Sequence, residues 1–179
     1  MAEVTPTKVL LMRLCFVGLA LVIVFFRLLP LDTVPRNWAP PDLIIALAFT
    51  WSLRRPDYIS AGLLALVMLL TDFLFHRPPG LLTLLVVLGC EFLKSRTLPH
   101  RETTFVAEWL AVAIVIAAIT LANRMVLSLL AVEQAPLSLS VVEMLATIAI
   151  YPLVVWFSQG LLGVRKLTAA EAEALGVHP

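Results

Sequence analysis

The chain has 179 residues, of which 61% are hydrophobic and 14% are charged, and its mean hydropathy is +0.99. Soluble globular domains contain about 45–50% apolar and about 25% charged residues. The composition therefore argues against a water-soluble enzyme and excludes an intrinsically disordered chain. The net charge of +1 excludes a broad basic surface for nucleic acid. The composition instead predicts a bundle of helices that uses the lipid bilayer as its solvent.

Prolines divide the chain, because a proline lacks an N–H group and tends to mark the ends of helices. Reading between them gives six apolar segments, at about 9–29, 42–53, 58–75, 80–93, 104–130 and 137–162. The first, third, fifth and sixth are long enough to span, since a span needs about 20 residues. The second and fourth would reach only about 18 and 21 Å as helices, so they are either short spans or re-entrant segments. The first segment is expected to be a retained helix and not a cleaved signal peptide.

Basic residues help to choose between these topologies, because cytoplasmic loops carry an excess of Lys and Arg. Six spans with cytoplasmic termini place nine basic residues inside, namely Lys8, Arg13, Arg54, Arg55, Lys94, Arg96, Arg101, Arg165 and Lys166. Four fall outside, namely Arg27, Arg36, Arg77 and Arg124. If both short segments were re-entrant, Arg54 and Arg55 would move outside and Arg77 inside. The counts favour an all-α, polytopic protein with six transmembrane helices, two of them short.

The domain organisation follows from this count. Residues 1–164 form a single six-helix transmembrane domain, and residues 165–179 form a short cytoplasmic tail. The tail is rich in Ala and Glu and favours helix, but it is too short to fold alone.

Charged residues inside apolar runs are the most informative, because a charge in the membrane must face the bundle interior or reach the interface. Arg124 lies six residues before the end of its segment, and Glu143 lies six residues after the start of the next. Both are then about 9 Å below the outer boundary, which predicts an ion pair. Asp72 is a possible second partner, and Asn123 a neutral one. The group is either a structural pair or a polar cavity for an anionic or zwitterionic ligand, and the structural interpretation is favoured.

Two further acidic residues have simpler interpretations. Glu91 is expected to pair with Lys94 three residues later on one helix face. Glu108 is expected to lie at the membrane interface. Pro152, preceded by Tyr151, predicts a kink and freed backbone carbonyls near the middle of the last segment.

Small residues in the fifth segment recur at a spacing that permits close approach of helices, or that is ordinary alanine usage. The two pairs are Ala113 with Ala117 and Ala118 with Ala122. Cys15 and Cys90 are expected to be small buried apolar side chains. No phosphate-binding loop, zinc-protease motif or nucleophile elbow occurs in the sequence. We therefore expect no catalytic residue, no metal site and no cofactor.

Two stretches resemble the rod shape-determining protein MreD family. The first runs from Pro41 to Tyr58 and reads PDLIIALAFTWSLRRPDY, and the second places Asp72 before the turn RPPGL at residues 77–81. The positions that match the family pattern are Pro41, Asp42, Arg54, Arg55, Pro56, Pro78 and Gly80, together with Asp72.

The resemblance implies a non-enzymatic, multi-pass protein of the bacterial inner membrane that acts in cell elongation and lateral peptidoglycan synthesis. It implies binding to the transmembrane and juxtamembrane segment of MreC. Through MreC it implies indirect association with MreB and with the RodA/penicillin-binding-protein synthase pair. The family is also similar to the six-helix substrate-binding subunits of energy-coupling-factor transporters, which makes a central ligand cavity conceivable. Fold alone does not fix function.

Two functions from different classes therefore stay open. The first is a scaffold that packs laterally against a partner helix, with contacts expected on the lipid-facing side of the first three segments, at Ser60, Ala61 and Gly62. The alternative is a small-molecule or lipid-binding subunit of a membrane transporter, with Asp72, Arg124 and Glu143 around its cavity.

Overall fold

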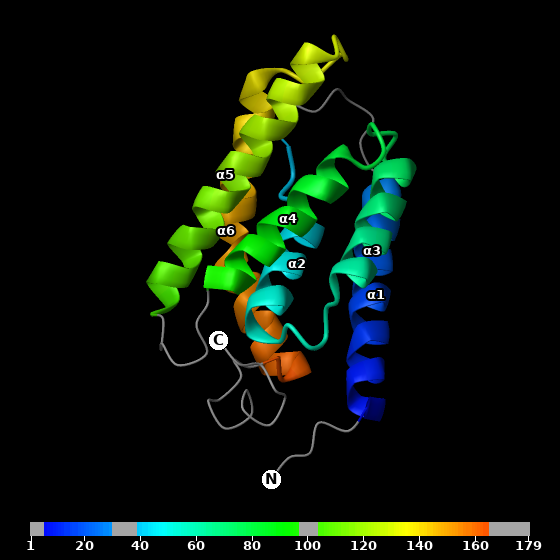
Figure 1. The fold of residues 1–179 in the computed structure, drawn as a ribbon, viewed down its shortest axis with the longest axis vertical. Helices are drawn as coiled ribbons and strands as arrows, with labels where there is room; N and C mark the ends of the chain where they lie inside the picture. The colour runs from blue at the N-terminus through cyan, green and yellow to red at the C-terminus, as the bar shows by residue number, and fades with distance from the viewer. Residues whose placement is uncertain (1–5, 30–38, 97–103, 165–179) are drawn as a thin grey trace.

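The fold is entirely α-helical within residues 6–29, 39–96 and 104–164, which are the residues that the computed structural model describes. This part of the chain forms six helices (Figure 1). Their bounds are α1 Pro6–Leu28, α2 Leu43–Arg54, α3 Ala61–Leu74, α4 Leu81–Arg96, α5 Phe105–Leu129 and α6 Leu137–Leu162. The predicted all-α class with six helices is confirmed. The tail at 165–179 lies outside the described residues.

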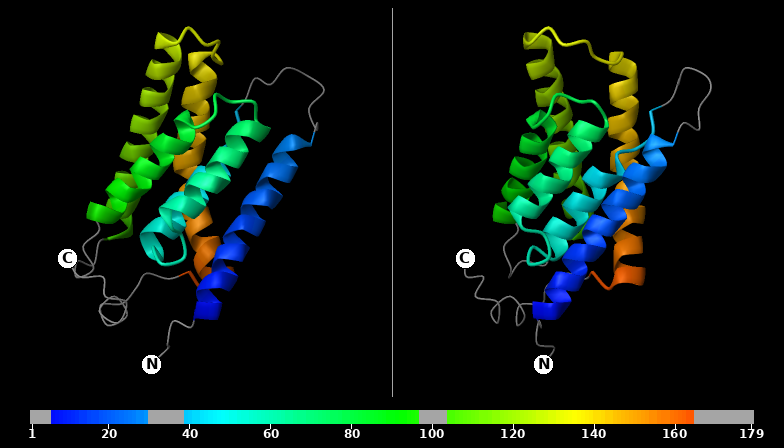
Figure 2. Two further views of the ribbon diagram at one scale, coloured as in Figure 1. Left: turned by 45° about the vertical axis from the view of Figure 1, so that its right-hand side comes forward. Right: turned by 90° about the vertical axis from the view of Figure 1, so that its right-hand side faces the viewer.

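Consecutive helices run in opposite directions along one common axis, as Figure 2 shows. The six helices therefore share two ends. The Arg54 end contains the starts of α1, α3 and α5 and the last turns of α2, α4 and α6. The Arg27 end contains the opposite termini. Helices α5 and α6 extend beyond α3 and α4 at the Arg27 end (Figure 1).

Three helices are long and apolar enough to cross a membrane, namely α1, α5 and α6. Helix α3 is shorter than the predicted segment 58–75, because it begins only at Ala61. The residues before it follow Pro56 and form a turn, with Tyr58 and Ile59 buried in the core. The side chain of Ser60 then caps α3 by accepting a hydrogen bond from Leu63 N at 3.3 Å. The first residues of this apolar segment therefore pack in the core without forming part of the helix.

Helix α2 is the centre of the bundle. Ten of its twelve residues are buried, and it packs against α1, α4 and α6. A helix that is apolar all round is one that other helices enclose, which explains how a segment of about 18 Å is accommodated without spanning alone. Trp51 is fully buried in α2 and donates its indole N–H to Ser158 Oγ of α6 at 3.1 Å.

Helix α1 packs less extensively. Its buried residues are Phe16, Ala20 and Val24, which recur every four positions and form one narrow stripe. This stripe faces α2 and α3, and the Phe16 ring lies 5.6 Å from the Trp51 ring between centroids. The other sides of α1 carry exposed leucine, valine and phenylalanine side chains, as expected of a helix with lipid on most of its circumference.

A close approach of helices occurs at Gly89 of α4. A Cβ at Gly89 would lie 2.9 Å from side-chain carbons of both Val115 and Ile119. The buried face of α5 includes Val112, Val115, Ile116 and Ile119, whereas Ala118 is exposed. Because glycine has only a hydrogen atom in place of a side chain, α4 can pack closely against α5 at Gly89.

Helix α6 continues through Pro152. Because this proline has no N–H group, the carbonyl four residues earlier, that of Ile148, loses its usual donor. The indole N–H of Trp109 from α5 donates to this carbonyl at 2.9 Å. The freed carbonyl that the sequence predicts is thus satisfied by a side chain of the neighbouring helix.

Candidate functional site

Four charged side chains form a network at the Arg27 end, and each comes from a different part of the chain. Arg27 at the end of α1 lies 3.2 Å from Asp42 Oδ2 and 2.9 Å from Glu143 Oε1 of α6. Arg77, in the α3–α4 turn, lies 3.5 Å from Asp42 and 3.7 Å from Glu143. Two cations and two anions therefore neutralise one another, as charges in a membrane protein require.

The network is held in place by neutral contacts. Both guanidinium groups lie over the Phe75 ring, at 5.2 Å for Arg27 and 5.5 Å for Arg77. The backbone N–H of Asp42 donates to Thr147 Oγ1 at 2.8 Å, and this hydroxyl donates to the carbonyl of Glu143 at 2.7 Å. Asp42 Oδ1 also caps α2 by accepting from Ile45 N at 3.3 Å. The network thus fixes the start of α2 against α6.

Asp72 does not join this network, contrary to the sequence-based expectation. It is completely buried in α3, and its Oδ2 accepts from Gly80 N at 3.1 Å, Thr83 N at 3.4 Å and Thr83 Oγ1 at 2.7 Å. These donors belong to the first turn of α4, whose N–H groups have no partner within the helix. Asp72 therefore caps α4 from a neighbouring helix, and Gly80 supplies the left-handed φ of +90° that the turn needs.

The turn after α3 directs Arg77 towards the network. His76 adopts a left-handed φ of +54°, and the N–H of Arg77 donates to the carbonyl of Asp72 at 3.0 Å. Together with the bond from His76 N to Phe73 O at 3.2 Å, this is the helix-ending pattern that glycine usually provides. The same residues thus end α3 and place a guanidinium group.

The predicted ion pair between Arg124 and Glu143 is wrong. Arg124 Nη1 donates instead to the carbonyl of Ala135 at 3.1 Å and to Ser140 Oγ, while Glu143 pairs with Arg27 and Arg77. The two residues have matching depths, but Glu143 lies on the face of α6 that packs against α2. Asn123, the expected neutral partner, lines the same pocket as Arg124.

A second buried polar group lies at the Arg54 end. Arg54 Nη2 lies 3.1 Å from Glu108 Oε1, and the two side chains are 4% and 5% exposed. The hydroxyl of Tyr151, itself fully buried, donates to the same carboxylate oxygen at 2.9 Å. Glu108 lies in the first turn of α5 and connects α2, α5 and α6 inside the bundle, a set of contacts that the sequence did not predict.

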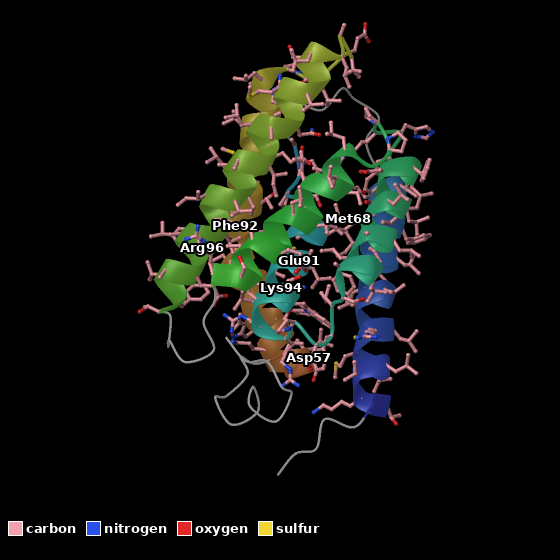
Figure 3. The ribbon with its side chains drawn as sticks, viewed as in Figure 1. Asp57, Met68, Glu91, Phe92, Lys94 and Arg96 are labelled. Atoms are coloured by element: carbon pink, nitrogen blue, oxygen red, sulfur yellow. The ribbon has the colours of Figure 1, made fainter. Side chains whose placement is uncertain are left out.

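The Arg54 end contains two further pairs. Arg55 forms a salt bridge with Asp57 at 3.1 Å and stacks over the Tyr58 ring at 4.6 Å. The predicted pair of Glu91 and Lys94 is confirmed, at 2.9 Å. Figure 3 shows both residues on α4, with Asp57 below them at the same end.

The positions that match the family pattern thus have distinct structural roles. Asp42 and Arg54 belong to the two buried charge groups, and Arg55 forms the largely buried pair with Asp57. The prolines lie at turns: Pro41 precedes the cap of α2, Pro56 follows its last residues, and Pro78 precedes Gly80 in the turn before α4. The conformation of the motif is therefore explained by helix ends and charge pairing.

Two hollows mark the described surface. One is a pocket of about 390 Å³ at the Arg27 end, between the α3–α4 turn, α5 and α6, and it contains Arg77, Arg124 and Glu143. The other is a groove of about 400 Å³ between α1 and α6 with α2 as its floor. Its lining is entirely apolar and consists of Leu19, Ile23, Leu43, Leu47, Leu153, Val154, Trp156 and Phe157.

The residues expected to contact a partner, Ser60, Ala61 and Gly62, are exposed at the start of α3. They do not line the apolar groove. Among the described residues, no group of three or more His, Cys, Asp or Glu side chains is arranged to hold a metal ion.

Comparisons of the chain with protein-family models, with curated proteins and with solved structures found no match.

Sequence reasoning missed Arg27, Thr147 and Tyr151 as members of the buried polar groups. A signal was present in α6, where Glu143, Thr147 and Tyr151 recur every four residues, and Ser158 follows seven residues later. This spacing places all four on one helix face. A polar stripe on an apolar helix predicts the side that packs inward.

Proposed function

We propose that this protein is a non-enzymatic scaffold of the bacterial cell-elongation machinery in the inner membrane, and that it acts by binding MreC within the bilayer. The proposal rests on the resemblance to the MreD family together with one observation, the apolar groove between α1 and α6. In this proposal both termini lie in the cytoplasm, because six of the nine described basic residues lie at the Arg54 end, namely Lys8, Arg13, Arg54, Arg55, Lys94 and Arg96.

The groove supports helix docking for two reasons. First, its walls carry no polar surface, so that a partner would be recognised by shape and van der Waals contact, which are the main forces between helices in lipid. Second, the groove exposes two large aromatic side chains, Trp156 at 71% and Phe157 at 40%, beside the loosely packed α1. Aromatic side chains of this kind provide much of the contact area at interfaces.

The charge networks support the same proposal, because their charged side chains already have partners inside the bundle. Four charges at the Arg27 end neutralise one another, and Glu108 is engaged by Arg54 and Tyr151. These contacts connect α1, α2, α5 and α6 to one another. A bundle connected in this way, with an apolar groove, is suited to holding a second helix.

The test is co-purification of MreC with full-length protein in which the groove is filled. Leu19→Trp and Ile23→Trp place a bulky side chain in the groove and are expected to reduce the recovered MreC at least about tenfold. Ile114→Trp is the matched control, because Ile114 is an apolar residue of α5 that is 69% exposed and lies outside the groove. Full recovery with both groove variants would contradict the proposed site.

The start of α3 is the competing surface. Ala61→Trp and Gly62→Trp add the same bulk there, and a Cβ at Gly62 meets no atom within 4 Å. Loss of MreC only with these two variants would move the contact to α3 while retaining the scaffold. No recovery of MreC with the wild-type protein would reject the proposed function itself.

A further inference from the structure

The pocket at the Arg27 end combines charge with apolar surface, and nothing in the proposed scaffold function uses it. It lies where α5 and α6 extend beyond α3 and α4 (Figure 1). Its volume of about 390 Å³ is within the range of about 300–1,000 Å³ that small-molecule sites have. Ile116, Ile119 and Met144 form part of its apolar wall.

Arg124 is a cation of this pocket that forms no salt bridge with an acidic side chain of the described residues. Within the described residues, its side chain donates hydrogen bonds to neutral acceptors: Nη1 donates to the carbonyl of Ala135 at 3.1 Å and to Ser140 Oγ. Gln134 Nε2 donates to the backbone carbonyl of Arg124 at 3.2 Å. The two bonds from Nη1 hold the guanidinium group in place, and its positive charge can attract an anion.

Acceptors for a positive group line the same pocket. Glu133 is exposed and forms no salt bridge with any described residue, and the Glu143 side chain is 31% exposed although Oε1 is used by Arg27 and Arg77. Gln134 Oε1 is buried and accepts no hydrogen bond from the described residues. A buried acceptor without a donor is costly, and a ligand N–H group would satisfy it.

We propose that this pocket binds a small zwitterion, with a phosphate or carboxylate group on Arg124 and an ammonium group near Glu133 and Gln134. The chemistry is shared by two sources, the head group of an ethanolamine phospholipid and a free soluble zwitterion. The apolar wall would contact the carbon skeleton of either one. The pocket lining carries both a positive group, Arg124, and the negative groups Glu133 and Glu143. It therefore favours a zwitterion over a simple anion, which the two carboxylates would repel.

The experiment uses the full-length protein in nanodiscs of phosphatidylglycerol, with native mass spectrometry as the readout. Phosphatidylethanolamine is added as the lipid probe and glycerophosphoethanolamine as the soluble probe. We expect retention of at least one of the two probes, at least about tenfold above an equal amount of added phosphatidylglycerol. Retention of the soluble probe identifies the head-group chemistry as sufficient, whereas retention of the lipid probe alone identifies a lipid site.

Variants separate the pocket from general effects of charge. Arg124→Gln is expected to reduce retention at least about tenfold, and Arg96→Gln is the matched control, since Arg96 loses the same charge on the exposed end of α4. Glu133→Gln provides a second variant on an exposed rim residue, which leaves helix packing intact, and it is expected to weaken retention as well. Retention of neither probe, equal retention of phosphatidylglycerol, or unchanged retention by both Arg124→Gln and Glu133→Gln would overturn the proposal.

Discussion

Substitutions in the buried group of Arg54, Glu108 and Tyr151 are expected to have large effects on the free energy of unfolding. Arg54 and Glu108 are 3.1 Å apart and are only 4% and 5% exposed. Removing Glu108 takes this counter-charge from the buried Arg54 guanidinium group, and removing Arg54 takes from Glu108 its buried guanidinium partner. Breaking a buried pair in this way costs about 3–5 kcal/mol. We therefore expect Glu108→Leu and Arg54→Met each to lower the free energy of unfolding by about that amount. Tyr151→Phe removes one hydrogen bond to a charged group and is expected to cost about 1.5–3 kcal/mol.

The double variant should be far less damaging than the sum of the single ones, because it replaces the pair by apolar side chains of similar volume. We expect a coupling energy of about 2 kcal/mol or more from this double-mutant cycle. The measurement is the free energy of unfolding in detergent micelles titrated with dodecyl sulfate. Tryptophan fluorescence reports the transition, since buried Trp51 packs in the same core.

The pair of Glu91 and Lys94 is the matched control. Its N–O distance is 2.9 Å, similar to that of the buried pair, but the Glu91 side chain is 49% exposed. Exposed pairs at this spacing contribute about 0.2–0.5 kcal/mol. Equal coupling energies in the two cycles would refute the reasoning that burial, and not distance, sets the value of these charges.

Three further predictions use the same unfolding assay. Asp72→Asn removes the charge that accepts three hydrogen bonds at the start of α4 and should cost about 1–3 kcal/mol; an unchanged transition would contradict the capping role. Trp109→Phe leaves the carbonyl of Ile148 without its donor and should cost about 1 kcal/mol, and no loss would mean that Pro152 needs no compensation. Gly89→Ala forces Val115 and Ile119 to move and should destabilise by about 1–3 kcal/mol, while Gly160→Ala, with open space around its Cβ, should stabilise α6 by up to about 1 kcal/mol.

The helices were predictable because their signals are local. The predicted segments 104–130 and 137–162 agree closely with Phe105–Leu129 and Leu137–Leu162, since an apolar run between turn residues fixes a helix without reference to other segments. The third segment was overestimated by the same reasoning. Its first apolar residues, Tyr58 and Ile59, are buried in the non-helical stretch before α3. Hydropathy does not distinguish burial in such a stretch from burial in a helix.

The partners of the charges were not predictable in this way. Depth along a helix follows from counting residues, but the side on which a residue lies depends on how each helix is rotated in the bundle. Arg124 and Glu143 have equal depth and opposite charge. Glu143 nevertheless pairs with Arg27, which lies in the last turn of α1. That contact spans 116 residues of sequence and depends on the assembled fold.

The most direct test of the central claim is site-specific photo-crosslinking to MreC in cells, with a photoreactive amino acid placed singly along the described helices. We predict crosslinks from Trp156 and Leu153, which line the groove between α1 and α6, and none from Ile114 on the exposed face of α5. Crosslinks from Ile114 with none from the groove positions would contradict docking of MreC in the groove.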